Sequence, residues 1–330
     1  MSEPLLNLNI PASQHTVDVC VIDSTADIRV PLEFFVKDPL PGHDILKCPS
    51  YVFLIESPLG RRVLFDLGLR VDKESLPPVI RKGIPGLIMD AEKDIATILQ
   101  EVGRYALDDI DSIIWSHGHT DHIGDPSTFP PSTELVVGSG FKDAILPGYP
   151  ADPNGVILES DYAGRQLREI SFESGLEIGH FRAVDFFGDG SFYLLEAPGH
   201  AVGHMCALAR TTPTTFIFMG ADGCHHCTIC PGPLLESIHP NHSQTMPYYS
   251  QLSAAPGRDV AEAEATISKM ASFDASEDVF VIIAHDKSLS EIIDFFPNKA
   301  NDWKEKGWKI ASRWRFLADF QDATSKSSVA

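Results

Sequence analysis

Positive charge is scarce in this chain. Its 330 residues include 26 lysines and arginines against 46 aspartates and glutamates, which gives a formal net charge of −20. Nucleic-acid binding needs a basic surface that displaces counterions, and anionic membranes attract clusters of lysine and arginine. The charge balance therefore argues against both kinds of partner, and we expect no nucleic acid and no membrane.

Long apolar runs are also missing. No stretch approaches the roughly 20 apolar residues that a membrane-spanning helix needs. The first 12 residues contain neither the basic region nor the apolar region of a secretory signal. We therefore expect a cytoplasmic protein.

Cysteine is sparse, with six residues in the chain. Without a secretory signal, these are expected to be reduced thiols. Cys224, Cys227 and Cys230 have the spacing C-x-x-C-x-x-C, which leaves two interpretations. They form a third metal site with His225 or His226 as fourth ligand, or they are uncomplexed thiols lining a pocket. We favour the thiols, because such tight spacing leaves little room for a closed site.

Apolar residues make up 43% of the chain, which is ordinary for a globular protein. The sequence shows no internal repeat and no linker between two cores. We expect one domain over residues 1–330, with flexible ends at 1–14 and 321–330.

Hydrophobic periodicity predicts a mixed α/β chain. Two apolar segments are interrupted by proline. Residues 25–49 are interpreted as an irregular excursion, and residues 69–90 as a lid or wall. Residues 139–165 are interpreted as loop, and 289–296 and 302–320 as helices or turns. Helices are predicted at 94–102 and 260–273, and strands at 17–22, 50–56, 61–66, 111–115, 134–137, 177–187, 191–196, 205–210, 215–219 and 278–284.

The densest group of reactive side chains follows the predicted strand 111–115. Four side chains with metal-ligand chemistry lie within six residues, with the spacing H-x-H-x-D-H: His117, His119, Asp121 and His122. Imidazole nitrogen and carboxylate oxygen are zinc-type ligands, and burying so many of them without a cation is costly. The motif therefore predicts a site for two adjacent cations at the end of this strand.

Similar residues follow other predicted strands. His200, Asp222 and His285 each come after an apolar run and are bordered by glycine or a loop. Asp66 also closes a strand, and two roles remain open for it. It either caps the strand end or orients a metal-bound imidazole from behind.

The series H-x-H-x-D-H, P-G-H-x-x-G-H, G-A-D and A-H-D resembles the metallo-β-lactamase superfamily over about residues 17–286. It is most similar to the N-acyl-homoserine lactone lactonases, because the last histidine stands in an Ala-His-Asp context. The resemblance implies a four-layer αββα sandwich with two metal sites between the sheet edges. His117, His119 and His200 would hold one metal, Asp121, His122 and His285 the other, and Asp222 would bridge them. The implied cofactor is two zinc ions, with iron, manganese or cobalt as alternatives, and His204 is expected to lie behind the ligands.

The implied activity is hydrolysis of a lactone or cyclic ester of a hydrophobic small molecule. Hydroxide generated from a shared water would attack the carbonyl, with Asp121 orienting that nucleophile. Alternative functions are a thioesterase that releases acyl or polyketide chains, a lactam hydrolase and, in a different class, a non-hydrolytic iron-dependent protein. Related lactonases are often dimers, so the resemblance also implies a homodimer.

One position departs from the lactonase pattern. Those enzymes carry a tyrosine three residues after the bridging aspartate, whereas this chain has His225, followed by His226. Either imidazole has the chemistry of a general acid near neutral pH, and the alternative is a solvent-exposed loop histidine. His225 is our candidate catalytic residue beside Asp121.

Overall fold

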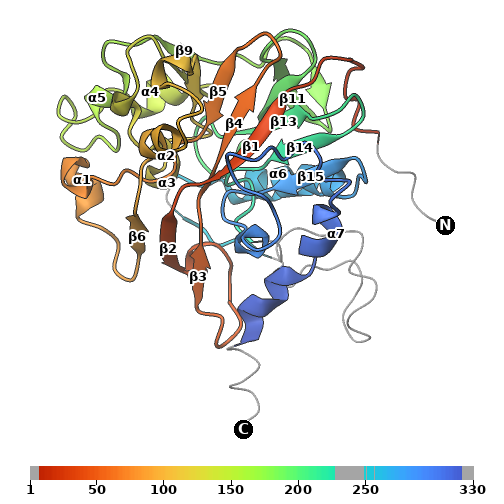
Figure 1. Ribbon diagram of the computed structural model, residues 1–330. Helices are drawn as coiled ribbons and strands as arrows, with labels where there is room; N and C mark the ends of the chain where they lie inside the picture. The colour runs from red at the N-terminus through yellow and green to blue at the C-terminus, as the bar shows by residue number, and fades with distance from the viewer. Residues whose placement is uncertain (1–6, 227–248, 250, 256, 322–330) are drawn as a thin grey trace.

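Most of the described strands form two sheets of six strands each (Figure 1). The computed structural model describes residues 7–226, 249, 251–255 and 257–321. The first sheet has the order β1 (Asp18–Asp23), β4 (Tyr51–Glu56), β5 (Arg62–Phe65), β7 (Ser112–Ile114), β8 (Glu134–Val137) and β9 (Leu167–Glu169). The second has the order β10 (Glu177–Ile178), β11 (Phe181–Asp185), β12 (Phe192–Glu196), β13 (Met205–Arg210), β14 (Phe216–Met219) and β15 (Val279–Ile282).

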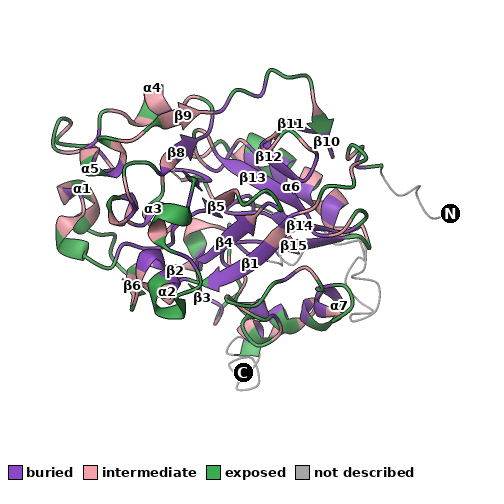
Figure 2. Cartoon of the chain, turned by 45° about the horizontal axis from the view of Figure 1, so that its top comes forward, coloured by how far each residue is buried: buried purple, intermediate pink, exposed green. Residues whose placement is uncertain are grey.

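Alternate side chains on these strands face different cores. On β4, Phe53 packs between the two sheets with Ile217 of β14, whereas Leu54 packs with Leu99 of helix α2 (Ile95–Val102). On the far side of the second sheet, Phe218 packs in the same cluster as residues of helix α6 (Val260–Asp274). The layers are therefore helix, sheet, sheet and helix, which confirms the predicted αββα sandwich. Figure 2 shows the buried strands at the centre of this arrangement.

A third, smaller sheet has the order β3 (Ile45–Cys48), β2 (Ala26–Pro31) and β6 (Ile88–Ala91). It joins the two proline-interrupted segments, and its strands β2 and β3 show that the prediction of an irregular excursion over 25–49 was wrong. The antiparallel pairing of Ile28 with both Cys48 and Met89 holds the three strands together. Each strand is only four to six residues long, and the prolines around them hid their periodicity.

The remaining helices are short. Residues 139–165, predicted as loop, contain α4 (Phe141–Ile145) and α5 (Glu159–Tyr162). The C-terminal region holds η6 (Lys287–Leu289), α7 (Trp308–Ser312) and η7 (Arg315–Phe320) rather than long helices. Other single turns are η1 (Leu32–Phe34), η2 (Lys73–Ser75), α1 (Pro78–Arg81), η3 (Leu107–Asp109), α3 (Thr120–Ile123) and η4 (Pro126–Thr128). Over the described residues, none of the helices has the length and apolar character to cross a membrane.

Strand direction brings the ligand-type residues to one place. β5, β7 and β8 are parallel neighbours, and β12 and β14 run alike because both are antiparallel to β13. β15 is parallel to β14, so the ends of these three strands also share an edge. Two hydrogen bonds join the sheets there: Met205 N–H donates to Ser116 O at 2.8 Å and Tyr51 N–H to Ala284 O at 2.9 Å.

Candidate metal centre

Short turns after the strands aim the ligand side chains at one another. After β7, the chain passes His117 and His119 and makes the single turn α3, which returns His122 to the interior. Gly124 ends this turn with φ +48°, and a Cβ there would lie 2.6 Å from Leu67 O, so the close approach requires glycine.

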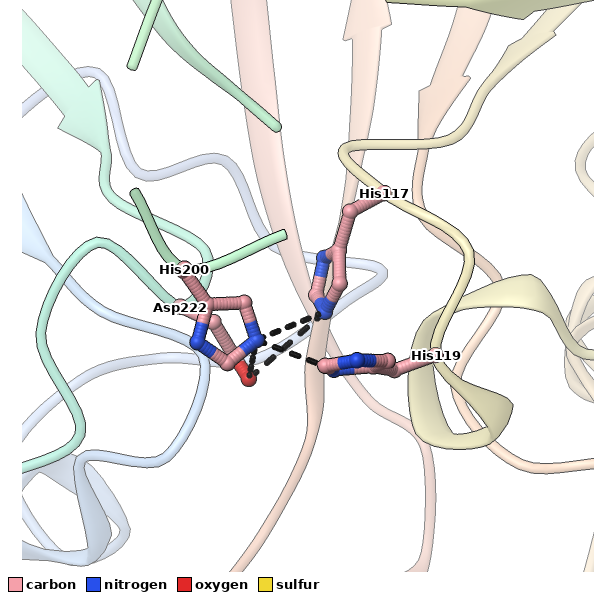
Figure 3. A group of neighbouring side chains, drawn as sticks. All are labelled: His117, His119, His200 and Asp222. Carbon is pink, nitrogen blue, oxygen red and sulfur yellow. Dashed lines mark hydrogen bonds and ion pairs between the residues drawn. The ribbon is translucent and has the colours of Figure 1, made fainter. Parts of the chain in front are cut away.

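The first group consists of His117, His119, His200 and Asp222 (Figure 3). His200 Nε2 lies 3.2 Å from His117 Nε2 and 2.9 Å from His119 Nδ1. Asp222 Oδ2 lies 3.3 Å from the same His200 nitrogen. His119 is exposed as a residue although its Nδ1 faces this group, whereas the other three side chains are buried. The first group therefore reaches solvent on the His119 side.

The second group consists of Asp121, His122 and His285. Asp121 Oδ2 lies 3.5 Å from His285 Nε2 and 3.9 Å from His122 Nε2. The other oxygen of Asp222, Oδ1, lies 3.0 Å from each of these two nitrogens. Asp222 thus presents one carboxylate oxygen to each group.

The hydrogen bonds behind the imidazoles test whether a cation fits. His122 Nδ1 donates to Asp66 Oδ2 at 2.8 Å, and His285 Nδ1 donates to Pro49 O at 2.7 Å. In the neutral rings each Nε2 then carries a lone pair, and both lone pairs face the Asp222 oxygen. His122 Nε2 and Asp222 Oδ1 are buried without a hydrogen-bond partner among the described residues. Each Nε2 lone pair and Asp222 Oδ1 face each other at 3.0 Å and repel unless a cation lies between them. These residues therefore fit a metal ion.

Asp66 holds this arrangement from behind. Its carboxylate accepts from Ser116 N–H at 2.7 Å and Ser116 Oγ–H at 2.9 Å, in addition to His122 Nδ1–H. Ser116 Oγ in turn accepts from His117 Nδ1–H at 3.0 Å. Of the two roles left open for Asp66, the geometry supports orientation of imidazoles, and it adds Ser116, which the sequence analysis did not single out. Its position directly before the first histidine was the available signal.

The electrostatics of the two groups differ in the absence of a cation. Burial, together with neighbouring imidazoles, lowers the pKa of His117 and of His200 well below the ordinary value, so both rings are neutral. For His122 and His285 burial acts in the same direction, but the Asp222 carboxylate outweighs it and raises the pKa well above the ordinary value. Protons would therefore occupy this half of the site, and a cation must displace them.

The histidines near the ligands have distinct surroundings. His204 Nδ1 donates to Ala197 O at 2.8 Å and its Nε2 accepts from Asp222 N–H at 3.2 Å, so it lies behind a ligand as expected. His225 Nε2 lies 3.1 Å from Asp222 Oδ2, and its ring stacks on Phe35 with 4.1 Å between centroids. His226 instead pairs with Asp319 Oδ2 at 3.1 Å. Of the two adjacent histidines, His225 is the one in contact with the centre.

The cysteine motif is described only at its first residue. Cys224 is buried, and its Sγ lies 3.2 Å from His226 O. Among the described residues it belongs to neither group of convergent ligands. Cys227 and Cys230 lie outside the described residues, so both interpretations of the motif stay predictions.

A four-layer αββα fold with histidines and aspartates converging between its sheet edges defines a class of metal-dependent hydrolases. The sequence pattern described as "Metallo-beta-lactamase superfamily" matches residues 45–210. The chain belongs to this superfamily and is a hydrolytic enzyme.

Two individual relatives are similar over nearly the whole of this chain. The chain is 42% identical over 349 residues to a protein of Fusarium pseudograminearum (strain CS3096) named gamma-lactamase FDB1, covering 94% of this chain and 84% of the relative. It is 45% identical over 332 residues to a Penicillium brevicompactum protein named cytochrome P450 monooxygenase mpaDE', but spans only 39% of that protein's length.

Among solved structures, a B. thuringiensis AiiA mutant with N-decanoyl-L-homoserine bound at its active site has a TM-score of 0.62 at 18% identity. The match covers 86% of this chain and 99% of the other. At this identity the likeness concerns the fold alone.

Proposed function

We propose that the enzyme holds two metal ions and opens a lactone or a similar cyclic ester of a small molecule. The observation that carries this proposal is the position of Asp222, whose Oδ2 faces the first ligand group and whose Oδ1 faces the second. A carboxylate shared in this way supports two cations a few ångströms apart rather than one.

The ligand set bears on the choice of metal. Five imidazoles and two carboxylates make up the two groups. Nitrogen and oxygen donors without thiolate suit zinc, and also iron, manganese and cobalt. We propose zinc in both sites, with these other metals as alternatives. Bound cations of this kind would supply a nucleophile from water near neutral pH and would polarise the substrate carbonyl.

Asp121 would act both as a ligand and as the residue that orients the nucleophile. Its side chain is 16% exposed, unlike the fully enclosed His122 beside it. Ser50 Oγ–H donates to the backbone oxygen of Asp121 at 2.7 Å and so fixes its position. If Asp121→Ala kept the wild-type kcat with its metal content intact, the orienting role would be excluded.

His225 would contact the substrate as a neutral hydrogen-bonding group. Burial lowers its pKa to about 4 against the opposing effect of Asp222, so the ring is uncharged at pH 7. The single N–H of the neutral ring is then on Nε2, which faces Asp222 Oδ2 at 3.1 Å, and a developing oxyanion would compete with that oxygen for its hydrogen bond. We expect His225→Phe to lower kcat by roughly 10²-fold with metal content unchanged. An unaltered kcat would remove His225 from the mechanism.

The aromatic ring of Phe35, beside the centre, bears on the class of substrate. Phe35 stacks on His225 and offers an apolar surface next to the ligands, which suits a hydrophobic acyl or aromatic group. A γ-lactam is the second candidate, because a relative 42% identical over nearly the whole chain is named a gamma-lactamase.

The test is a hydrolysis screen of the zinc-loaded protein against γ-lactones, γ-lactams and thioesters of matched acyl groups. We expect turnover of the lactones that is lost in Asp222→Ala and retained in Asp23→Ala, which alters an exposed aspartate at the end of β1. Preferential turnover of lactams would support the second candidate. Hydrolysis of thioesters alone would contradict both.

A further inference from the structure

Arg258 is a cation held next to the metal centre by the backbone. Its Nη1 donates to Phe34 O at 2.9 Å and to Ser253 O at 3.0 Å. The next residue, Asp259, donates its N–H to Gly199 O at 2.8 Å, directly before the ligand His200. These three hydrogen bonds fix the arginine beside the loop that carries His200.

The guanidinium also lies against the aromatic surface of the site. Arg258 Cζ is 5.8 Å from the centroid of Phe35, and this same ring stacks on His225. His225 in turn lies 3.1 Å from Asp222. A continuous set of contacts therefore runs from Arg258 to the carboxylate between the two ligand groups.

Arg258 lies on the side of the centre formed by His200 and His225. The N–H of the next residue, Asp259, bonds to Gly199 O, and the Phe35 ring beside the guanidinium stacks on His225. Arg258 is half-buried, and burial lowers its own pKa although Asp222 opposes this. A substrate group that reaches Phe35 beside the centre would therefore meet this positive charge.

No carboxylate neutralises the arginine within the part of the chain that the structure describes. Its Nη1 is occupied by two backbone oxygens, whereas Nε and Nη2 have no acceptor among the described residues. A half-buried guanidinium gains most from a bidentate anionic partner, and a substrate carboxylate has that geometry.

We propose that Arg258 is a substrate-positioning residue that pairs with a carboxylate on the substrate, away from the bond that is cleaved. This inference rests on the proposed function and extends it, since it assigns the substrate an anionic substituent beside its cyclic ester or amide. The motifs themselves have few basic residues near them in the sequence. Arg258 escaped notice there because it lies 36 positions after Asp222 in the chain.

The direct test is calorimetric titration of the zinc-loaded protein with glutarate and with glutaric acid monoamide. Both ligands offer one carboxylate to the metals, and they differ only in the charge at the other end. We expect the wild type to bind glutarate about tenfold more tightly, a difference of about 1.4 kcal/mol. Arg258→Met should bring the two affinities within about twofold, and Arg258→Lys should keep part of the preference.

The matched control is Arg61→Met. Arg61 is also half-buried and lies 4.6 Å from the centroid of Phe187, but on the turn between β4 and β5. It should keep the full preference for glutarate. A thermal melt checks whether Arg258→Met, which loses the bonds to Phe34 and Ser253, is still folded. If it is not, Arg258→Lys, which keeps the positive charge, is compared with the wild type instead.

Equal affinity for the two ligands in the wild type, including no detectable binding of either, overturns the inference. A tenfold preference that survives in Arg258→Met also overturns it. Because this experiment measures binding, it is separate from the hydrolysis screen, and either experiment can fail without the other.

A kinetic experiment tests the same inference. With a γ-lactone that carries a carboxylate on its ring as substrate, Arg258→Met should weaken substrate binding and raise the KM about tenfold. The kcat for this lactone, and both constants for the matching carboxamide, should change little.

Discussion

Asp66 contacts candidate ligands of both groups although it does not itself face the proposed metals. It accepts hydrogen bonds from Ser116 and His122, and through Ser116 it also reaches His117. One carboxylate therefore sets the ring orientation of a ligand in each group. Residues that orient ligands in this way typically contribute 10- to 100-fold to metal affinity.

We predict that Asp66→Asn lowers zinc affinity by roughly 10- to 100-fold, because an amide cannot accept from all these donors at once. Competition with a chromophoric chelator would measure this loss. Asp152→Asn is the control, because Asp152 is only partly buried in the loop between α4 and α5 and accepts a local hydrogen bond from Asn154 N–H. Equal zinc affinity for Asp66→Asn and the wild type would show that the network does not support the ligands.

At the scale of elements, the sequence was most informative where burial is continuous. β4, β5 and the strand before His117 are buried along nearly their whole length, and their hydrophobic runs predicted them. The convergence of the candidate ligands was predictable because each follows such a run. The small third sheet was missed, because its strands are short and half-exposed and their pairing partners lie up to 65 residues away. Arg258 and Ser116 were missed because the roles proposed for them depend on contacts rather than on spacing.

The loop that carries His200 depends on contact with helix α6. At Gly199, with φ +114°, a Cβ would lie 2.1 Å from Ala263 N, so the helix backbone lies directly against the loop. We predict that Gly199→Ala displaces His200 and lowers zinc stoichiometry. Gly188→Ala is the matched control, since Gly188 also has positive φ but no atom within 4 Å of the added Cβ. It should cost only roughly 1 kcal/mol and keep both metals. Full zinc content in both variants would refute the role of this contact.

A buried ion pair fastens helix α5 to the end of the first sheet. Arg70 lies 2.6 Å from Asp125 Oδ2 and 2.5 Å from Asp161 Oδ1. Burial nevertheless raises the pKa of Asp161 to about 6. The folded state then holds this proton more tightly than the unfolded state, whose pKa is about 4. The stability from Asp161 is therefore present at low pH and is lost as the pH rises from about 4 through about 6.

We predict that the free energy of unfolding of the wild type, relative to Asp161→Asn, falls by up to about 3 kcal/mol between pH 4 and pH 6.5. Urea unfolding of both proteins at intervals of half a pH unit would measure the difference. Since the asparagine cannot titrate in this range, effects of pH on the rest of the chain cancel. A constant or rising difference would contradict the proposed protonation of Asp161.

At the scale of the whole molecule, the proposed metal centre closes the gap between two sheets. His117, His119, Asp121 and His122 come from the first sheet, and His200, Asp222 and His285 from the second. Because both sheets would contribute ligands, metal binding would be coupled to the packing of one sheet against the other. At a free zinc concentration 100 times the dissociation constant, binding would stabilise the fold by about 2.7 kcal/mol. The oligomeric state and the extent of the domain remain predictions from sequence.

The measurement that tests the central claim most directly is a crystal structure of the zinc-loaded protein with anomalous diffraction data above the zinc edge. We predict two anomalous peaks, one among His117, His119 and His200 and one among Asp121, His122 and His285, with a carboxylate oxygen of Asp222 next to each. A single peak, or none between the sheet edges, would contradict the account.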